Sequence, residues 1–109
     1  MFGPPPLDLP PDAFVAEREL GAPVLDVRTP AEFAEGHLAG AVNVDVLDPS
    51  FLDRIQSLDL PEDGPVYLYC RSGNRSGTAA QALVRLGYDG ALNVGGFEAL
   101  AAAGAEVAG

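Results

Sequence analysis

The only cysteine in the sequence, Cys70, opens the run Cys-Arg-Ser-Gly-Asn-Arg-Ser. An apolar stretch at 66–69 precedes it and a helical pattern at 77–86 follows it, which predicts a strand before the thiol and a helix after it. Backbone N–H groups at a helix start have no partner within the helix and stabilise a nearby anion. With Arg71 and Arg75 close in sequence, this setting favours a thiolate, the nucleophilic form of cysteine.

Other interpretations of the thiol are weaker. A free cysteine is most often a small buried apolar residue, but such a residue is not usually followed by a polar, arginine-containing run. The single histidine, His37, has no local link to Cys70, so a Cys–His mechanism is disfavoured and we interpret His37 as a turn residue that bonds to the backbone. One cysteine and one histidine are too few for a zinc site, and we expect no metal and no cofactor.

The charge of the chain limits its partners. Its 109 residues carry a net charge of −10, which argues against binding to nucleic acid or to anionic membranes. No acid occurs between residues 64 and 88, whereas three of the six arginines lie there: Arg71, Arg75 and Arg85. A locally positive loop on an acidic body could attract a small anion, although the uneven spread could equally arise by chance.

Length and composition fit one globular domain, 48% apolar, with no apolar run near the ~20 residues that span a bilayer. The N-terminus lacks the basic start and apolar segment of a secretory signal. One cysteine cannot form an internal disulfide, and a free thiol suits a reducing compartment. The sequence therefore predicts a cytoplasmic protein.

Helical and extended patterns alternate along the chain, which predicts an α/β fold around a mostly parallel sheet. The stretch 65–69 is apolar nearly throughout, as in a strand buried on both faces. A turn is expected at 36–40, and the alanine-rich end from residue 100 is expected to fray. The other expected strands are 7–9 at an edge, 23–27, 41–44 and 91–94, and the expected helices are 11–20, 30–35 capped by Thr29, 51–58, 77–86 and 96–103.

Three segments of the sequence resemble rhodanese-type sulfurtransferases. The run at 70–76 resembles the family's active-site loop, the stretch 25–44 its Asp-x-Arg strand end and the Gly-His-Leu turn beyond it, and 92–97 its final strand with a Gly-Gly turn. The resemblance implies a single domain over residues 1–109, with the domain proper at about 7–106 after a proline-rich lead. It also implies a three-layer sandwich of a five-stranded, mostly parallel sheet with helices on both faces.

The resemblance also implies the chemistry. Cys70 would take a sulfane sulfur from a small anionic donor such as thiosulfate, become a persulfide, and pass the sulfur to a thiophilic acceptor such as cyanide, a thiol or a protein. The backbone N–H groups of the loop would cradle the outer sulfur, and Arg71 and Arg75 would orient the donor. The substrate-binding residues implied in this way are Arg71, Ser72, Gly73, Asn74, Arg75 and Ser76.

Asp26 and Arg28 form the family's Asp-x-Arg pattern near the loop. They could support the site by pairing with a loop arginine or with Glu32. They could also form an ordinary structural ion pair, which is the more common arrangement because structural networks gather charges too.

Two alternatives differ in function from a small-molecule sulfurtransferase. One is a carrier that receives a persulfide from a cysteine desulfurase and turns over small donors slowly. The other is a phosphatase or arsenate reductase, since some phosphatases that share the fold use Cys-x5-Arg. Here Arg75 gives the spacing Cys-x4-Arg. A shorter loop suits one sulfur atom better than a tetrahedral oxyanion, so the second alternative is disfavoured.

Overall fold

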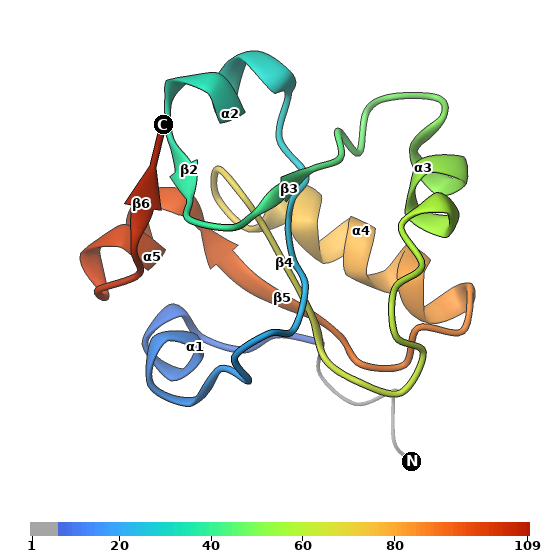
Figure 1. Cartoon of the computed structure of the whole chain (residues 1–109), viewed down its shortest axis with the longest axis horizontal. Helices are drawn as coiled ribbons and strands as arrows, with labels where there is room; N and C mark the ends of the chain where they lie inside the picture. The colour runs from blue at the N-terminus through green and yellow to red at the C-terminus, as the bar shows by residue number, and fades with distance from the viewer. Residues whose placement is uncertain (1–6) are drawn as a thin grey trace.

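The computed structural model describes residues 7–109 and shows a parallel sheet between layers of helices (Figure 1). The helices are α1 (Pro11–Glu17), α2 (Pro30–Glu35), α3 (Phe51–Ser57), α4 (Asn74–Arg85) and α5 (Phe97–Ala102). The strands are β1 (Val24–Asp26), β2 (His37–Leu38), β3 (Val42–Asn43), β4 (Val66–Cys70), β5 (Ala91–Gly96) and β6 (Val107–Ala108). The α/β class and the alternation of elements expected from the sequence are confirmed.

The main sheet has four parallel strands in the order β3-β1-β4-β5. The fifth strand expected at residues 7–9 is reduced to one parallel bridge between Asp8 and Asn93. Two backbone hydrogen bonds form there, Leu9 N–H to the Asn93 carbonyl at 2.8 Å and Asn93 N–H to the Leu7 carbonyl at 2.6 Å. Pro10 has no N–H to extend the pairing, and α1 begins at the next residue, so the strand stops at one bridge.

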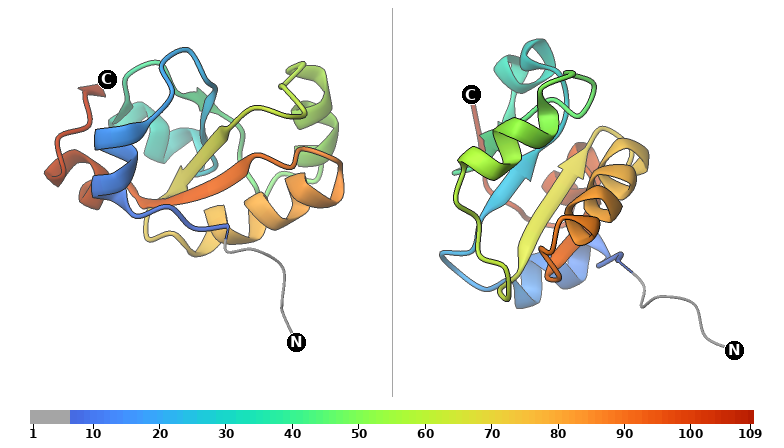
Figure 2. Two further views of the ribbon diagram at one scale, coloured as in Figure 1. Left: turned by 90° about the horizontal axis from the view of Figure 1, so that it is seen from below. Right: turned by 90° about the vertical axis from the view of Figure 1, so that its right-hand side faces the viewer.

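Two apolar clusters lie on opposite faces of this sheet. Phe51 and Ile55 of α3 and Leu83 of α4 pack on one face with Leu25 and Leu68. On the other face α1 and α5 pack against the sheet, with a core of Phe14, Val24, Tyr67, Tyr69, Val94 and Leu100. The left view of Figure 2 shows α1 and α4 on opposite sides of β4 and β5. The three-layer arrangement expected from the resemblance is therefore present.

The central strand β4 has all five of its residues buried, as its continuous apolar character predicts. Successive side chains of a strand point to opposite faces. Tyr69 therefore belongs to the α1/α5 side, and Cys70 belongs to the α3/α4 side. The alternation thus decides which face of the sheet the thiol occupies. As the last residue of the inner strand β4, Cys70 also lies at the carboxyl edge of the sheet.

Some element boundaries differ from expectation. Helix α4 begins at Asn74 and not at residue 77, because Gly73, with φ at 96°, turns the chain directly into the helix. The expected turn at 36–40 contains β2, which pairs antiparallel with β6. The chain end therefore pairs with β2 instead of fraying, and Figure 1 shows β6 beside β2.

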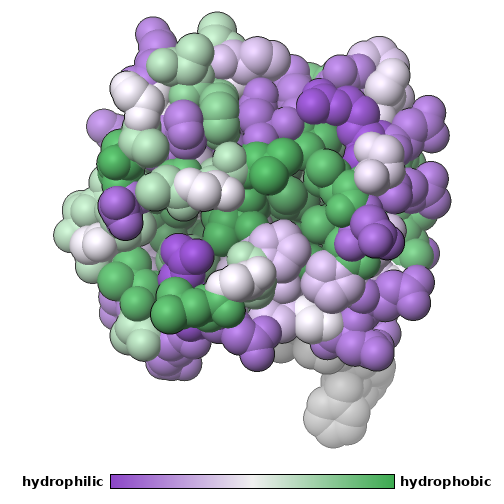
Figure 3. Space-filling view, in the orientation of Figure 1, coloured by the Kyte–Doolittle hydropathy of each residue, from purple (hydrophilic) through white to green (hydrophobic). Residues whose placement is uncertain are grey.

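On the face seen in Figure 3, apolar surface gathers near the centre, over β3 and toward α3, with polar residues above it and to its right. Val42 of the edge strand β3 and Leu52 of α3 are among the exposed large apolar residues. With only two residues, β3 offers a very short open edge for pairing with another chain. No helix within residues 7–109 is long and apolar enough to span a bilayer.

Candidate active site

Cys70 is the last residue of β4, and its side chain is fully buried. Its Sγ accepts a hydrogen bond from the Gly73 N–H at 3.0 Å and lies 3.3 Å from the Ser76 Oγ. Gly73 lies in the turn between β4 and α4, and Ser76 lies in the first turn of α4. The sulfur is thus enclosed by the loop and the first turn of the helix, the arrangement that the order strand–thiol–helix indicates.

The surroundings of Cys70 affect its pKa in opposite directions. Burial raises the pKa, whereas hydrogen bonds from the Ser76 hydroxyl and from the backbone N–H groups of Ser76, Ser72 and Gly73 lower it. The hydrogen bonds outweigh the burial, so the pKa of the Cys70 thiol lies below its ordinary value. The Cys70 thiol is therefore easier to ionise than a free cysteine.

The loop after Cys70 rests on the Gly95–Gly96 turn at the end of β5. Cys70 pairs with Gly96 across the two strands, after a shift in register. A Cβ on Gly96 would overlap the carbonyl oxygen of Arg71, so this position has no room for a side chain. A Cβ on Gly73 would also lie 3.4 Å from the Gly95 Cα. The glycine pair thus allows the loop to approach the last strand closely.

Arg75 is bound by an acid and not open to solvent as a free cation. Its two terminal nitrogens lie 2.9 and 3.1 Å from the two carboxylate oxygens of Glu32 on α2. Glu32 also accepts from the Thr29 N–H, while the Thr29 hydroxyl accepts from the Glu32 N–H, which closes a capping box. The bidentate pair joins the start of α4 to α2 and fixes the loop from that side.

The pKa of Glu32 is lowered from an ordinary 4.5 to about 2, mainly by its hydrogen bonds from Arg75. Burial raises this pKa, and hydrogen bonds from Thr29 lower it further. Because this pKa is lower in the folded state, the stabilisation is complete above about pH 4.5 and is lost as the pH falls toward 2. We expect Glu32→Gln to lower the free energy of unfolding at neutral pH by about 1 kcal/mol or less, since the pair is partly exposed. Urea midpoints at a series of pH values should show the gap to wild type shrinking below pH 4.5. A gap that grows on acidification would contradict this assignment.

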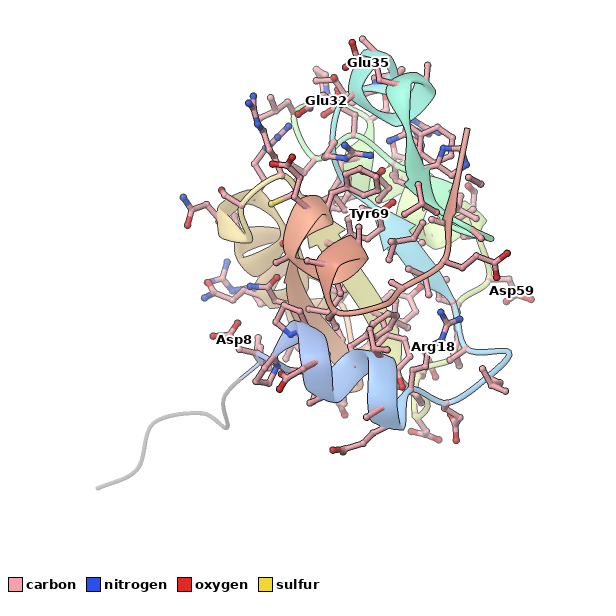
Figure 4. All side chains as sticks on the ribbon, turned by 90° about the vertical axis from the view of Figure 1, so that its left-hand side faces the viewer. Asp8, Arg18, Glu32, Glu35, Asp59 and Tyr69 are labelled. Atoms are coloured by element: carbon pink, nitrogen blue, oxygen red, sulfur yellow. The ribbon has the colours of Figure 1, made fainter. Side chains whose placement is uncertain are left out.

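Arg71 is exposed and makes no ion pair within the described part of the chain. It borders a hollow of about 280 Å³ beside the loop. Figure 4 shows Glu32 and Glu35 together at this end of the molecule, above Tyr69. The hollow therefore carries charges of both signs, and its lining is Arg28, Glu32, Glu35, Gly36, Arg71, Phe97 and Glu98.

Asp26 and Arg28 pair with each other, and neither pairs with Glu32 or a loop arginine. Arg28 Nε and Nη2 donate to the Asp26 carboxylate at 2.9 and 2.6 Å, and Nη2 also donates to the Gly36 carbonyl at 2.6 Å. The Tyr69 hydroxyl donates to Asp26 Oδ2 at 2.8 Å and accepts from the Leu38 N–H. This buried network ties the end of β1 to β2 and β4.

The charges in this network are mutually stabilised. Burial lowers the pKa of Arg28, but the hydrogen bond and the charge of Asp26 more than compensate, so the pKa is raised. Burial raises the pKa of the Tyr69 hydroxyl, which stays a neutral donor to Asp26. The Arg28 guanidinium also lies 4.6 Å from the centre of the Phe97 ring. The pair is thus mainly structural, although Arg28 borders the hollow.

Three other residues considered in the sequence analysis do not contact the Cys70 sulfur through their side chains. The side chains of Ser72 and Asn74 are exposed and have no hydrogen-bond partner among residues 7–109. His37 lies on β2 with Nδ1 2.9 Å from the Phe33 carbonyl oxygen, and its ring stacks on Phe33. Within the part of the chain that the structure describes, no three His, Cys, Asp or Glu residues form a metal-binding group.

Asn93 of β5 is a part of the site that the sequence analysis did not single out. Its Oδ1 lies 2.7 Å from the Ser76 Oγ, and its Nδ2 donates to the Gly73 carbonyl at 3.0 Å. A polar residue between Leu92 and Val94, inside an otherwise apolar strand, is the signal that could have indicated it.

Comparisons with known proteins identify the family of the chain. The rhodanese-like domain family matches residues 11–103. The thiosulfate sulfurtransferase GlpE of Pseudomonas fluorescens (strain SBW25) is 41% identical over 91 residues, which cover 83% of this chain and 80% of that protein. The same enzyme of Pseudomonas entomophila (strain L48) is 39% identical over 89 residues, covering 81% of this chain and 78% of that protein.

Solved structures show the same fold. The rhodanese-like domain of an Anabaena protein superposes with a TM-score of 0.79 at 22% identity, over 94% of this chain and 79% of that one. A rhodanese with anions from E. coli superposes with a TM-score of 0.70 at 26% identity, over 81% of this chain and 98% of that one. With the family matched over most of its length, the chain belongs to the rhodanese-like domain family.

Proposed function

We propose that this protein is a sulfurtransferase that moves a sulfane sulfur from a donor such as thiosulfate to a thiophilic acceptor through a persulfide on Cys70. The observation that carries this proposal is the Cys70 sulfur at the end of the central strand, 3.0 Å from the Gly73 N–H and 3.3 Å from the Ser76 Oγ. The name of the relatives, thiosulfate sulfurtransferase, supports it.

In the first step the Cys70 thiolate attacks the outer sulfur of thiosulfate. A sulfur–sulfur bond forms to Cys70, the bond within thiosulfate breaks, and sulfite leaves with the electron pair. In the second step the acceptor attacks the outer sulfur of the persulfide, which returns Cys70 to its thiolate. Cyanide would leave as thiocyanate, and no external oxidant or reductant is needed.

The loop residues have separate roles in this proposal. The N–H groups of Ser72, Gly73 and Ser76 hold the negative charge on sulfur, and the Ser76 hydroxyl assists. Arg71, which is exposed, is the cation that can meet an anionic donor. Arg75, held by Glu32, fixes the loop and contributes its charge near the sulfur.

A second candidate function is a persulfide carrier between proteins. Two features favour it: the Cys70 side chain has no exposed surface, and the hollow beside its loop carries Glu35 and Glu98 as well as Arg71. Carboxylates at the hollow weaken the attraction of a small dianion. A protein donor would supply its own contacts to open the loop. The free thiol in either case fits a reducing compartment such as the cytoplasm.

Mass spectrometry of the intact protein tests both functions. After incubation with thiosulfate we expect the mass to increase by one sulfur atom, and cyanide should remove it, because cyanide attacks the outer sulfur of a persulfide. Cys70→Ser is the matched control and should gain nothing. Loading by a persulfide-bearing cysteine desulfurase but not by thiosulfate would support the carrier instead. No gain from either donor would refute both.

A further inference from the structure

The Asn93 side chain links the active-site loop to the last strand and to the segment before α1. Nδ2 donates to the Gly73 carbonyl and to Asp8 Oδ1, each at 3.0 Å. Oδ1 accepts from the Gly95 N–H at 3.1 Å and lies 2.7 Å from the Ser76 Oγ. Both polar atoms of the Asn93 amide therefore have two partners each. Through Oδ1, Asn93 contacts the Ser76 hydroxyl, which also contacts the Cys70 sulfur.

The chemistry of these partners fixes the direction of the amide. A carboxylate and a carbonyl can only accept, so Nδ2 must face Asp8 and Gly73. A backbone N–H can only donate, so Oδ1 must face Gly95. The Ser76 hydroxyl, 2.7 Å from an oxygen that can only accept, therefore donates its proton to Asn93.

The Ser76 hydroxyl has one proton and two acceptors within reach, Asn93 Oδ1 at 2.7 Å and Cys70 Sγ at 3.3 Å. While Cys70 is a neutral thiol, the oxygen is the better acceptor. When Cys70 ionises, the hydroxyl must rotate to donate to sulfur and give up its bond to Asn93. Ionisation of Cys70 is therefore opposed by the acceptor strength of Asn93.

Ser76 and Gly73, which both contact the Asn93 side chain, are also held by other parts of the structure. Ser76 lies in the first turn of α4 and is fully buried. The Gly73 carbonyl also accepts from the Gly77 N–H at 3.0 Å, so it keeps a partner if the Asn93 amide is removed. The loop should thus keep its place while the direction of the hydroxyl changes.

We propose that Asn93 is a positioning residue that sets the reactivity of Cys70 by competing with its sulfur for the single hydroxyl proton of Ser76. The proposal rests on the function above, in which Cys70 is the nucleophile. Its deciding measurement is the ionisation of the thiol, which needs no sulfur transfer, so a failure of sulfur transfer would not be mistaken for a failure of the competition.

Other charges near the thiol must be held constant in the test. The charged groups that contact Asn93, act on the loop arginines, line the hollow or pair with its lining lie on several elements. They are Asp8 before α1, Asp26 and Arg28 at the end of β1, Glu32 and Glu35 on α2, Asp45 after β3, Arg71 and Arg75 in the loop and the start of α4, and Glu98 on α5. Substitutions at Asn93 and Ser76 remove none of these charges, and the loss of the Asn93 contact with Asp8 is controlled for by a variant at Asp8.

Two replacements of similar size to asparagine should shift the Cys70 pKa in opposite directions. Asn93→Leu removes the competing acceptor, and we expect the pKa to fall by about half a unit, the effect of one neutral hydrogen bond. Asn93→Asp provides a stronger acceptor and a nearby negative charge, and we expect a rise of about one unit. Ultraviolet absorbance of the thiolate against pH gives the pKa, with Cys70→Ser subtracted, because the chain has one cysteine.

Coupling to Ser76 separates competition from a general structural role. In a Ser76→Ala background, Asn93→Leu should no longer lower the pKa. The same fall in both backgrounds, or a rise with Asn93→Leu, would overturn the proposal. If Asn93→Leu does not fold, Asn93→Asp is titrated in the wild-type and Ser76→Ala backgrounds, and an equal rise in both would overturn the proposal.

Asp8→Asn is the control, because it changes an exposed partner of Asn93 but leaves the contact to Ser76. It should leave the pKa nearly unchanged, and a shift as large as that of Asn93→Asp would show that charge alone acts on the thiol. The pH at which sulfur transfer is half-maximal should follow the titrated pKa in each variant.

Discussion

Replacing Cys70 with serine is expected to lower the rate of sulfur transfer from thiosulfate to cyanide by at least about 1,000-fold. A serine hydroxyl is not ionised at neutral pH, and the site offers hydrogen bonds to sulfur in place of a base that could activate a hydroxyl. Because serine can still accept from the Gly73 N–H, the free energy of unfolding should change by only about 1 kcal/mol. Release of thiocyanate measures the rate, and urea unfolding measures the stability.

Ser72→Ala is the matched control for this experiment. The Ser72 side chain is exposed and has no hydrogen-bond partner within residues 7–109, while its backbone N–H remains in the variant. Most of the activity should therefore survive. A Cys70→Ser protein with a rate close to that of Ser72→Ala would show that Cys70 does not carry the sulfur.

Arg28→Ala is expected to destabilise the protein by about 3–5 kcal/mol. The variant leaves the Asp26 carboxylate buried with the Tyr69 hydroxyl and the backbone N–H of residue 28, but without the cation that accompanies it. It also removes the donor to the Gly36 carbonyl and the contact with the Phe97 ring. For a domain of this size the melting temperature should fall by at least about 12 °C, at ~4 °C per kcal/mol. Calorimetry or circular dichroism during heating measures the change.

Arg54→Ala provides the comparison for a surface ion pair. Arg54 and Asp48 lie 3.9 Å apart, with side chains 46% and 37% exposed, so their pair contributes less than about 1 kcal/mol. The melting temperature of Arg54→Ala should remain close to that of wild type. An equally small effect of Arg28→Ala would mean that the buried pair adds little to stability.

Much of the fold follows from local patterns. The spacing of Thr29 and Glu32 predicts the capping box that the structure shows, and the apolar run at 65–69 predicts the buried central strand. These features depend on residues close in sequence, where periodicity and end signals are informative. The position of Cys70 between a strand and a helix could likewise be predicted from residues close to it in the sequence.

The partners within the site depend on contacts between distant residues. Arg75 and Glu32 are 43 residues apart, and no local pattern selects Glu32 over the other acids of the chain. The contact of Asn93 with Ser76 likewise depends on the register of β4 and β5. The antiparallel pairing of β2 with β6 also could not be predicted from the sequence. Each strand has only two residues, too few to show an alternating apolar pattern.

The enclosed position of Cys70 also affects how readily its sulfur is oxidised. A thiolate exposed to peroxide proceeds through sulfenic to sulfinic acid, and the later stage is irreversible in most proteins. A second sulfur atom or an added oxygen would each need space beside a side chain that has no exposed surface and is surrounded by packed residues, so the loop would have to move for either. The opening of the loop that would admit a sulfur donor would also admit peroxide, so the enclosure of Cys70 slows both reactions together.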